Sequence, residues 1–147
     1  ARDDDGVAHE QPRDDIAGVL FEPSGASWGQ VPLPPGFVQA IRDVTAKRGV
    51  VMLMDEVITG FRGGSGGPER AWGVTPYLCI LAKIVAGGLP GGAVAGKREI
   101  LDQIDFAASA AKKRDKIAHP GTYNANPLSA AAAVTALALV RDGDLAE

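Results

Sequence analysis

Three charged residues stand directly after runs of apolar residues, and their types suit one kind of chemistry. They are Glu22, Asp55 and Lys83. In a sheet of parallel strands, ligands bind outside the carboxyl ends of the strands, so these side chains are candidates for a common site. A lysine amine condenses with an aldehyde to give a Schiff base, and a carboxylate nearby keeps a pyridine nitrogen protonated. The pair Asp55 and Lys83 therefore carries the two charges that a pyridine-based aldehyde cofactor needs.

The surroundings of Lys83 support this chemistry, although plainer interpretations stay open. Lys83 lies within residues 81–85, which are otherwise apolar, so we expect its amine to be partly desolvated, which favours the neutral nucleophile. It can equally be an ordinary lysine at a strand end with its ammonium group in water. Asp55 can cap the turn that follows it. Glu56 can be a solvated or ion-paired side chain, and periodicity alone does not decide between these alternatives.

The elements that would position these residues read as an α/β fold without internal repeats. We expect strands at 16–21, 50–54, 78–82 and 93–95, and helices at 34–48, 98–104 and 127–140. The first helix has clear signals, with two prolines at its start and Gly49 after its end. Strand, helix and strand at this spacing predict a right-handed unit with parallel strands. Residues 60–73 are expected to form a long loop, a kind more often functional than idle.

Composition removes several other classes of function. The formal net charge of −3 argues against a nucleic-acid partner. Cys79 is the single cysteine, so no intrachain disulfide can form and a reducing, cytoplasmic setting is expected. Together with His9 and His119 it makes no ligand set with zinc-like spacing. The longest strongly apolar run, at residues 128–140, is too short to span a bilayer, and no signal-peptide pattern opens the chain. We therefore expect no membrane partner and no metal.

A nucleotide triphosphatase is the alternative enzyme class. Residues 50–56 have the form of a Walker B strand, with apolar residues followed by Asp-Glu. Residues 91–97 nearly match a phosphate loop, with two glycines and Lys97 at the required spacing. Arg98 stands where that motif needs a hydroxyl for magnesium, and the two motifs occur in reversed order. A phosphate-loop protein is therefore the weaker hypothesis.

Four segments together resemble the class III aminotransferases, which are pyridoxal-phosphate enzymes of fold type I. Residues 55–62 (DEVITGFR) resemble the motif around the aspartate that binds the pyridinium nitrogen. Residues 82–93 (AKIVAGGLPGGA) are similar to the segment around the Schiff-base lysine. Residues 121–127 (GTYNANP) resemble the segment whose threonine reaches the cofactor phosphate of the neighbouring subunit. Glu22-Pro23 with Gly25 and Gly29 matches the Glu-Pro loop. Four segments in register, from about Asp14 to the end, form a highly specific resemblance.

The resemblance implies a role for each matching residue. Lys83 would form the Schiff base with pyridoxal 5′-phosphate and later move the proton at the substrate Cα. Asp55 would bind the pyridinium nitrogen, and Val57 would pack beneath the ring. Thr122 would bind phosphate across a dimer interface; without the resemblance, its hydroxyl would be expected to satisfy its own turn. The implied fold is part of the large domain of a fold-type-I transferase, a mostly parallel sheet flanked by helices.

The implied activity is amino transfer by an aminotransferase or an aminomutase. The substrate would be an amino acid, an amine or an amino-aldehyde, and the protein a homodimer with shared active sites. Arg62, which ends the aspartate motif, is most like the branch that includes glutamate-1-semialdehyde aminomutase. Ser27, near the place of a second glutamate, argues against the ornithine and GABA type. Tyr77 and Ile80 depart from the family pattern and are expected to disturb local strand packing.

The chain also reads as a central fragment of a longer protein. It does not begin with methionine, and its 19 glycines are crowded mainly between Gly60 and Gly96. Residues 1–147 are expected to form part of the cofactor-binding large domain, with the upstream phosphate loop and the C-terminal small domain outside it. Such a chain should bind cofactor weakly and turn over poorly. The opposing hypothesis is a catalytically silent fragment or interaction module that keeps the fold alone.

Overall fold

The computed structural model describes residues 15–24, 29, 31–62, 64 and 66–143. The expectations for Asp14, Gly25 and Ser27 therefore lie outside the described residues. Strands form at β1 (Gly18–Phe21), β2 (Val51–Asp55), β3 (Leu78–Ala82) and β4 (Gly92–Gly96). Helices form at α1 (Phe37–Arg48), α2 (Gly67–Trp72), α3 (Arg98–Leu101), α4 (Phe106–Ala111) and α5 (Pro127–Asp142), with a 3₁₀ helix η2 (Lys83–Ala86).

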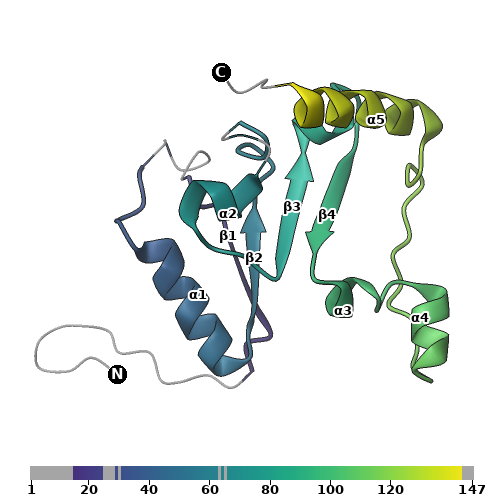
Figure 1. Ribbon diagram of the computed structural model, residues 1–147. Coiled ribbons are helices and arrows are strands. Elements are labelled where there is room, and N and C mark those ends of the chain that lie inside the picture. The colour runs from purple at the N-terminus through teal and green to yellow at the C-terminus, as the bar shows by residue number, and fades with distance from the viewer. Residues whose placement is uncertain (1–14, 25–28, 30, 63, 65, 144–147) are drawn as a thin grey trace, which may run out of the picture.

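The strands lie in one mostly parallel sheet, as expected (Figure 1). Its order is β1-β2-β3-β4; β2 pairs in parallel with both β1 and β3, whereas β4 is antiparallel to β3. Tyr77 and Ile80 do not disturb this packing, because β3 pairs with β4 over its whole length and with β2 over residues 78–80. The parallel pairings bring the carboxyl ends of the first three strands to the same edge of the sheet.

The core lies between β2 and α1. Met52 and Met54 of β2 are fully buried, and they pack with Val38 of α1 and with Val74. The helix ends at Gly49, whose left-handed φ of 66° and cap bonds to the last turn confirm the expected stop signal. The start of α1 is three residues later than expected. Gly36, at φ 79°, interrupts the helical path after the prolines, so α1 begins at Phe37.

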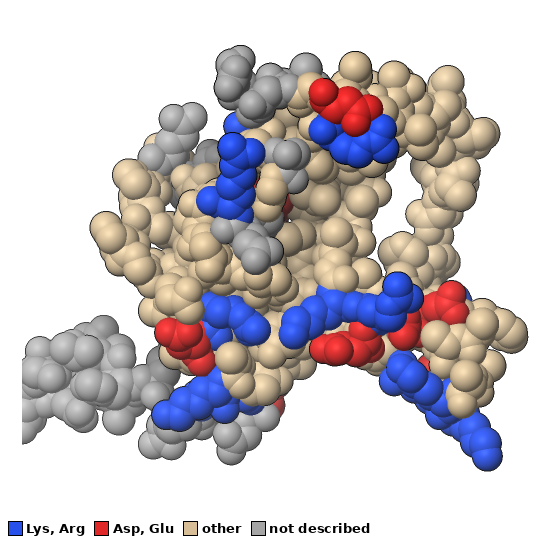
Figure 2. Space-filling view, in the orientation of Figure 1, with Lys and Arg blue, Asp and Glu red and all other residues tan. Residues whose placement is uncertain are grey.

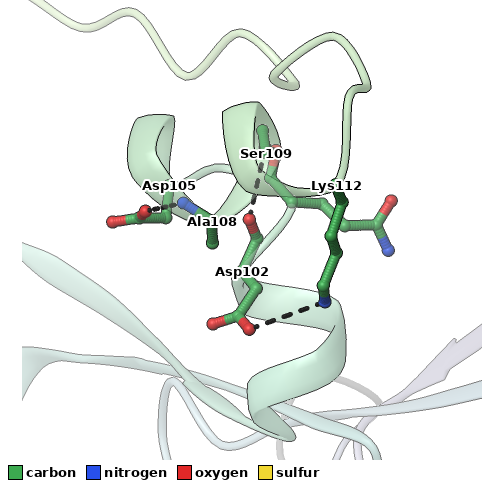
Figure 3. A network of polar contacts seen from close by, with 6 residues as sticks. Asp102, Asp105, Ala108, Ser109 and Lys112 are labelled. Carbon is green, nitrogen blue, oxygen red and sulfur yellow. Dashed lines mark hydrogen bonds and ion pairs between the residues drawn. The ribbon is translucent and has the colours of Figure 1, made fainter.

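Two helical segments differ from the sequence-based prediction. The expected loop at 60–73 contains α2. The helix expected at 98–104 ends at Leu101 as the short α3, and a separate helix, α4, follows it. Asp105 caps α4 by accepting a hydrogen bond of 2.7 Å from the Ala108 N–H, as Figure 3 shows. In the same network the Ser109 hydroxyl donates to the backbone carbonyl of Asp102, and the carboxylate Oδ2 of Asp102 lies 3.9 Å from the Lys112 amine. The aspartate before an Ala-rich run was a cap signal that the prediction overlooked.

Helix α5 packs against η2, which begins at Lys83. Its start is confirmed: Pro127 occupies the first turn, and the Asn126 side chain accepts hydrogen bonds from the Leu128 and Ser129 N–H groups. The Ser129 hydroxyl donates a 2.8 Å bond to the Pro90 carbonyl. At Gly87 a Cβ atom would lie 2.5 Å from the Ala132 carbonyl oxygen. The helix is thus held directly over the turn that follows the candidate cofactor lysine.

Candidate active site

Asp55 is the last residue of β2, and one of its carboxylate oxygens is already fixed. Oδ1 accepts a 2.9 Å hydrogen bond from the Val57 N–H, so the aspartate does cap the following turn, as its plainer interpretation expected. Within the described parts of the chain, Oδ2 has no hydrogen-bond or ion-pair partner. The half-buried Asp55 side chain can therefore present one oriented, negatively charged oxygen to a ligand.

Lys83 is the first residue after β3, and its side chain is exposed. The expected desolvation of its amine is wrong for this chain, because the backbone leaves the sheet here and it is Val85 and Ala86 that become buried. In the segments that the structure covers, the amine makes no hydrogen bond or ion pair. The residue has a left-handed φ of 54°, a backbone conformation that residues other than glycine adopt at an energetic cost.

The pairing of β2 with β3 places these two residues at one edge of the sheet. Asp55 stands opposite Ile80, and the Glu56 N–H donates a 2.9 Å bond to the Ile80 carbonyl. Lys83 follows Ile80 by three residues, just past the end of β3. Glu22 follows β1 at the same edge, because Phe21 stands opposite Met54. The three strand ends named from the sequence are thus brought together.

Glu56 is the polar residue whose position the sequence-based interpretation missed. Its side chain is 2% exposed, so it is neither solvated nor ion-paired at the surface. Oε2 accepts a 2.6 Å hydrogen bond from the Thr59 hydroxyl, and Oε1 is buried without a partner among the described residues. Burial raises the pKa of Glu56, opposed by the Thr59 hydrogen bond, with smaller increases from the charges of Asp55 and Glu22. The alternation Met52, Met54, Glu56 was a signal for the buried face.

Cys79 lies on β3 with a half-buried side chain and no disulfide. Burial, followed by the nearby charge of Glu56, raises the pKa of this thiol to about 11. The thiolate is the nucleophilic form of cysteine, so this group is inert near neutral pH. Cys79 is therefore part of the sheet interior and does not belong to the candidate chemistry.

Thr122 is not brought to the pair Asp55 and Lys83. The exposed segment that contains it leads from α4 to α5 on the side of the sheet where β4 is the edge strand (Figure 1), and β4 is two strands away from β2. Residues on both sides of it line a groove of about 630 Å³, together with Gly91–Ala93 at the start of β4 and residues of α5. Its hydroxyl makes no hydrogen bond within the described chain, so the expected local turn bond is absent. Thr122 is thus free to meet a group from outside this chain.

The surface around that segment is weakly charged. Figure 2 shows that, on the face in view, acidic and basic side chains gather toward the lower rim, over α3 and α4. Over α5, the same face is uncharged apart from a cluster of acidic and basic side chains at the C-terminal end of the helix, where Arg141 and Asp142 form an ion pair. Several apolar side chains of α5 and the preceding segment are exposed, among them Tyr123 at 82% and Val134 at 70%.

Left-handed backbone conformations mark the three segments that carry the motifs. Among the described residues other than glycine, positive φ angles occur at Phe61, Lys83, Lys113 and Ala125. Phe61 lies in the aspartate motif, Lys83 in the lysine segment and Ala125 in the threonine segment. Strained backbone is concentrated at functional sites, where the surrounding fold holds it in place. Three of these four positions coincide with the segments selected for their chemistry.

The phosphate-loop alternative does not fit this geometry. Such a loop needs free backbone N–H groups that face a ligand and lead into a helix. Residues Gly92–Gly96 instead form strand β4, paired in register with β3. The helix that follows, α3, has only four residues. The near-match in sequence therefore belongs to an antiparallel strand.

The family model described as aminotransferase class-III matches residues 6–147. This range includes the two strand ends and the segment before α5. The chain belongs to the class-III aminotransferase family.

Relatives within the family agree on the kind of enzyme. A glutamate-1-semialdehyde 2,1-aminomutase 2 of Brevibacillus brevis is 43% identical over 131 residues, which are 89% of this chain and 29% of that protein. A glutamate-1-semialdehyde 2,1-aminomutase of Prosthecochloris aestuarii is 41% identical over 127 residues, or 86% of this chain and 28% of its own length. The chain thus spans less than a third of the length of these relatives.

Solved structures similar to this chain are transaminases. An omega-transaminase from Sphaerobacter thermophilus superposes with a TM-score of 0.71 at 38% identity, covering 82% of this chain and 26% of that one. A structure described as a transaminase with PLP bound gives a TM-score of 0.74 at 32% identity, covering 86% and 29% of the two chains. The mostly parallel sheet with flanking helices is therefore the fold of these enzymes. None of the described helices is long and apolar enough to cross a membrane.

Proposed function

We propose that Asp55 and Lys83 hold pyridoxal 5′-phosphate and that the protein is a transaminase or aminomutase. The observation that carries the proposal is the arrangement of these two residues at neighbouring strand ends. One presents a carboxylate oxygen without a partner in the described chain, and the other an exposed amine without one. The family membership and the transaminase described with PLP bound support the same cofactor. When bound, the cofactor supplies an electron sink for the substrate's Cα.

Each residue has a distinct task in this proposal. Asp55 Oδ2 would accept a hydrogen bond from the ring nitrogen of the cofactor, while the Val57 N–H holds Oδ1 in place. The half-buried Val57 side chain would lie beneath the ring. The Lys83 amine would hold the cofactor through its aldehyde group and would move a proton to and from the substrate's Cα.

Thr122 completes the proposal from a neighbouring subunit. Its hydroxyl would donate to a phosphate oxygen of the partner's cofactor, so the protein would be a homodimer with shared active sites. Support comes from its exposed position and from the weakly charged, partly apolar surface beside it. Homodimer interfaces are enriched in such apolar surface. The upstream phosphate loop and the small C-terminal domain would lie outside these 147 residues, in the remaining length of the relatives.

The substrate would be an amino acid, an amine or an amino-aldehyde. Relatives named glutamate-1-semialdehyde 2,1-aminomutase support the aminomutase branch, and Arg62 at the end of the aspartate motif agrees with it. Solved neighbours named transaminases support the alternative within the same chemistry. We propose a cytoplasmic setting, without nucleic-acid or membrane partners. An interaction module that keeps only the fold is the opposing function, and the free Lys83 amine favours the enzyme.

A titration with pyridoxal phosphate tests the proposal. The wild-type chain should develop a visible absorbance band for the bound cofactor, with weak affinity, and Lys83→Ala should abolish it while keeping the far-ultraviolet circular dichroism. Lys97→Ala is the matched control and should keep the band. A band of equal strength in Lys83→Ala would show that another group binds the cofactor. A folded wild-type chain that shows no band would support the interaction module.

A further inference from the structure

Glu56 is a buried acidic residue that the proposed chemistry does not use. Its side chain continues the row of Met52 and Met54 on the inner face of β2 and is 2% exposed. A methionine or leucine would suit such a place better, because a buried carboxyl group loses its hydration. Only one of its oxygens has a hydrogen-bond partner in the described structure, and Oε1 has none. Because burying this carboxyl group costs free energy, we expect Glu56 to make an interaction that an apolar side chain could not make.

The contacts of Glu56 surround the residue that orients Asp55. The Thr59 hydroxyl donates to Oε2 at 2.6 Å, and the Gly60 N–H donates to the Glu56 carbonyl at 2.8 Å. These two bonds close the turn on which Val57 lies. The Val57 N–H in turn donates to Asp55 Oδ1 at 2.9 Å. A single turn therefore links the buried carboxyl group to the carboxylate at the strand end.

The same residue fixes this turn to the strand that leads to the lysine. The Glu56 N–H donates a 2.9 Å bond to the carbonyl of Ile80 on β3, three residues before Lys83. Gly60 allows this close packing, since a Cβ there would lie 2.7 Å from both the Glu56 carbonyl oxygen and a methyl group of Leu81. Glu56 thus stands at the junction of the two segments that carry the proposed cofactor-binding residues.

We propose that Glu56 is a positioning residue whose bond to Thr59 holds the turn after β2 and, through the Val57 N–H, fixes the orientation of Asp55 toward the cofactor. The inference rests on the proposed role of Asp55. Side chains that hold binding groups in place through hydrogen bonds contribute to affinity without touching the ligand. Burial, with smaller contributions from Asp55 and Glu22, raises the pKa of Glu56, whereas the Thr59 hydrogen bond lowers it. Cys79 on β3 also faces this group and stays protonated.

Three variants of the 147-residue chain separate positioning from simple packing. Glu56→Met restores the apolar row and removes the acceptor. Thr59→Val keeps the carboxyl group and removes only the donor. Glu56→Gln keeps the shape and an oxygen acceptor. The first readout is amide hydrogen exchange of Val57, with the Tyr77 amide, bonded to the Met52 carbonyl at 3.0 Å, as an internal control. The second is the dissociation constant for pyridoxal phosphate.

Glu56→Met should unfold at or above the wild-type temperature, yet lose about tenfold in Val57 protection and in cofactor affinity, the net contribution of about one hydrogen bond. Thr59→Val should give the same two losses, whereas Glu56→Gln should stay within about twofold of wild type. Tyr77 protection should not change in any of them. A loss of packing cannot explain these results, because Glu56→Met would lose Val57 protection and cofactor affinity although its overall stability is not reduced.

The failure of this inference differs from the failure of the proposed function. If Val57 protection is unchanged in both Glu56→Met and Thr59→Val, Glu56 does not hold the turn and the inference is wrong. If Val57 is loosened but the cofactor binds as tightly as before, its link to Asp55 is wrong. If the wild-type chain binds no cofactor, the proposed function fails, while the exchange of Val57 still decides whether Glu56 holds the turn.

Discussion

Lys83 stands three residues beyond Ile80, the residue that pairs with Asp55 across two parallel strands. The lysine leaves its strand with a left-handed φ of 54°, whereas Asp55 is held by the N–H of Val57. The backbone of Lys83 is thus strained, whereas the carboxylate of Asp55 is oriented by a hydrogen bond.

Replacing Lys83 by glycine should give a more stable chain than replacing it by alanine. A left-handed conformation costs about 1 kcal/mol for a residue with a Cβ atom, and glycine is free of this cost. We expect Lys83→Gly to exceed Lys83→Ala by about 0.5–1 kcal/mol in urea unfolding. Lys47, within α1, is the control, and there the glycine variant should be the less stable one. An alanine variant that is the more stable at both positions would show that Lys83 is not strained.

Two neighbouring glycines after η2 should differ in their tolerance of a methyl group. Gly87 has a φ of 62° and lies against α5, where a Cβ would be 2.5 Å from the Ala132 carbonyl oxygen. Gly88 has a φ of 86° and no atom within 4 Å of that position. Gly88→Ala should therefore lose about 1 kcal/mol, and Gly87→Ala about 3 kcal/mol. Equal losses in chemical denaturation would contradict the close packing of α5 on this turn.

The stability of the chain should depend on pH through Glu56. Burial raises its folded-state pKa above the ordinary value of 4.5. As the pH rises from 4.5, the unfolded chain releases this proton first, so the stabilisation present at lower pH is lost through the folded-state pKa. The free energy of unfolding of wild type minus that of Glu56→Gln should therefore decrease as the pH rises. A difference that is constant or increases would show that the pKa of Glu56 is not raised in the folded chain.

The ring of Tyr77 should stabilise the end of the sheet where β3 begins, opposite to the end that carries Asp55 and Lys83. The Arg42 guanidinium lies 4.5 Å and the Lys97 amine 4.6 Å from the ring centroid, so the tyrosine joins α1, β3 and the residue after β4. Each contact contributes about 0.5–1 kcal/mol. Tyr77→Leu should lose about 1–2 kcal/mol in urea unfolding, and Tyr77→Phe, which keeps the ring, should lose little. A phenylalanine variant as unstable as the leucine variant would assign the effect to the hydroxyl.

Local patterns in the sequence predicted much of the fold because each depends on neighbouring residues. Apolar runs identified the four strands, and Gly49 and Asn126 mark helix ends by capping, which is local chemistry. The helix α4 was missed because Asp105 was not recognised as the cap of the Ala-rich run that follows it. The antiparallel direction of β4 was not predicted, since it follows from pairing with a strand earlier in the chain.

The candidate site was predicted only where it depends on neighbouring residues in the sequence. The positions of Asp55 and Lys83 at strand ends follow from their local sequence. The exposure of Lys83 and the burial of Glu56 do not, because they depend on which elements cover each face of the sheet. The separation of Thr122 from the pair likewise depends on the path of α5. Local sequence therefore predicts which residues carry the chemical groups, whereas their burial and exposure depend on the packing of distant elements.

Selective capture of the cofactor by Lys83 tests the central claim most directly. The chain is mixed with pyridoxal phosphate, reduced with borohydride to fix the bond between lysine and cofactor, and mapped by peptide mass spectrometry. We predict that Lys83 is labelled at least about tenfold more than the exposed Lys47, which corresponds to a tenfold higher affinity of the cofactor for Lys83. Asp55→Ala should remove this preference. Equal labelling of Lys83 and Lys47 in the folded wild-type chain would contradict the account.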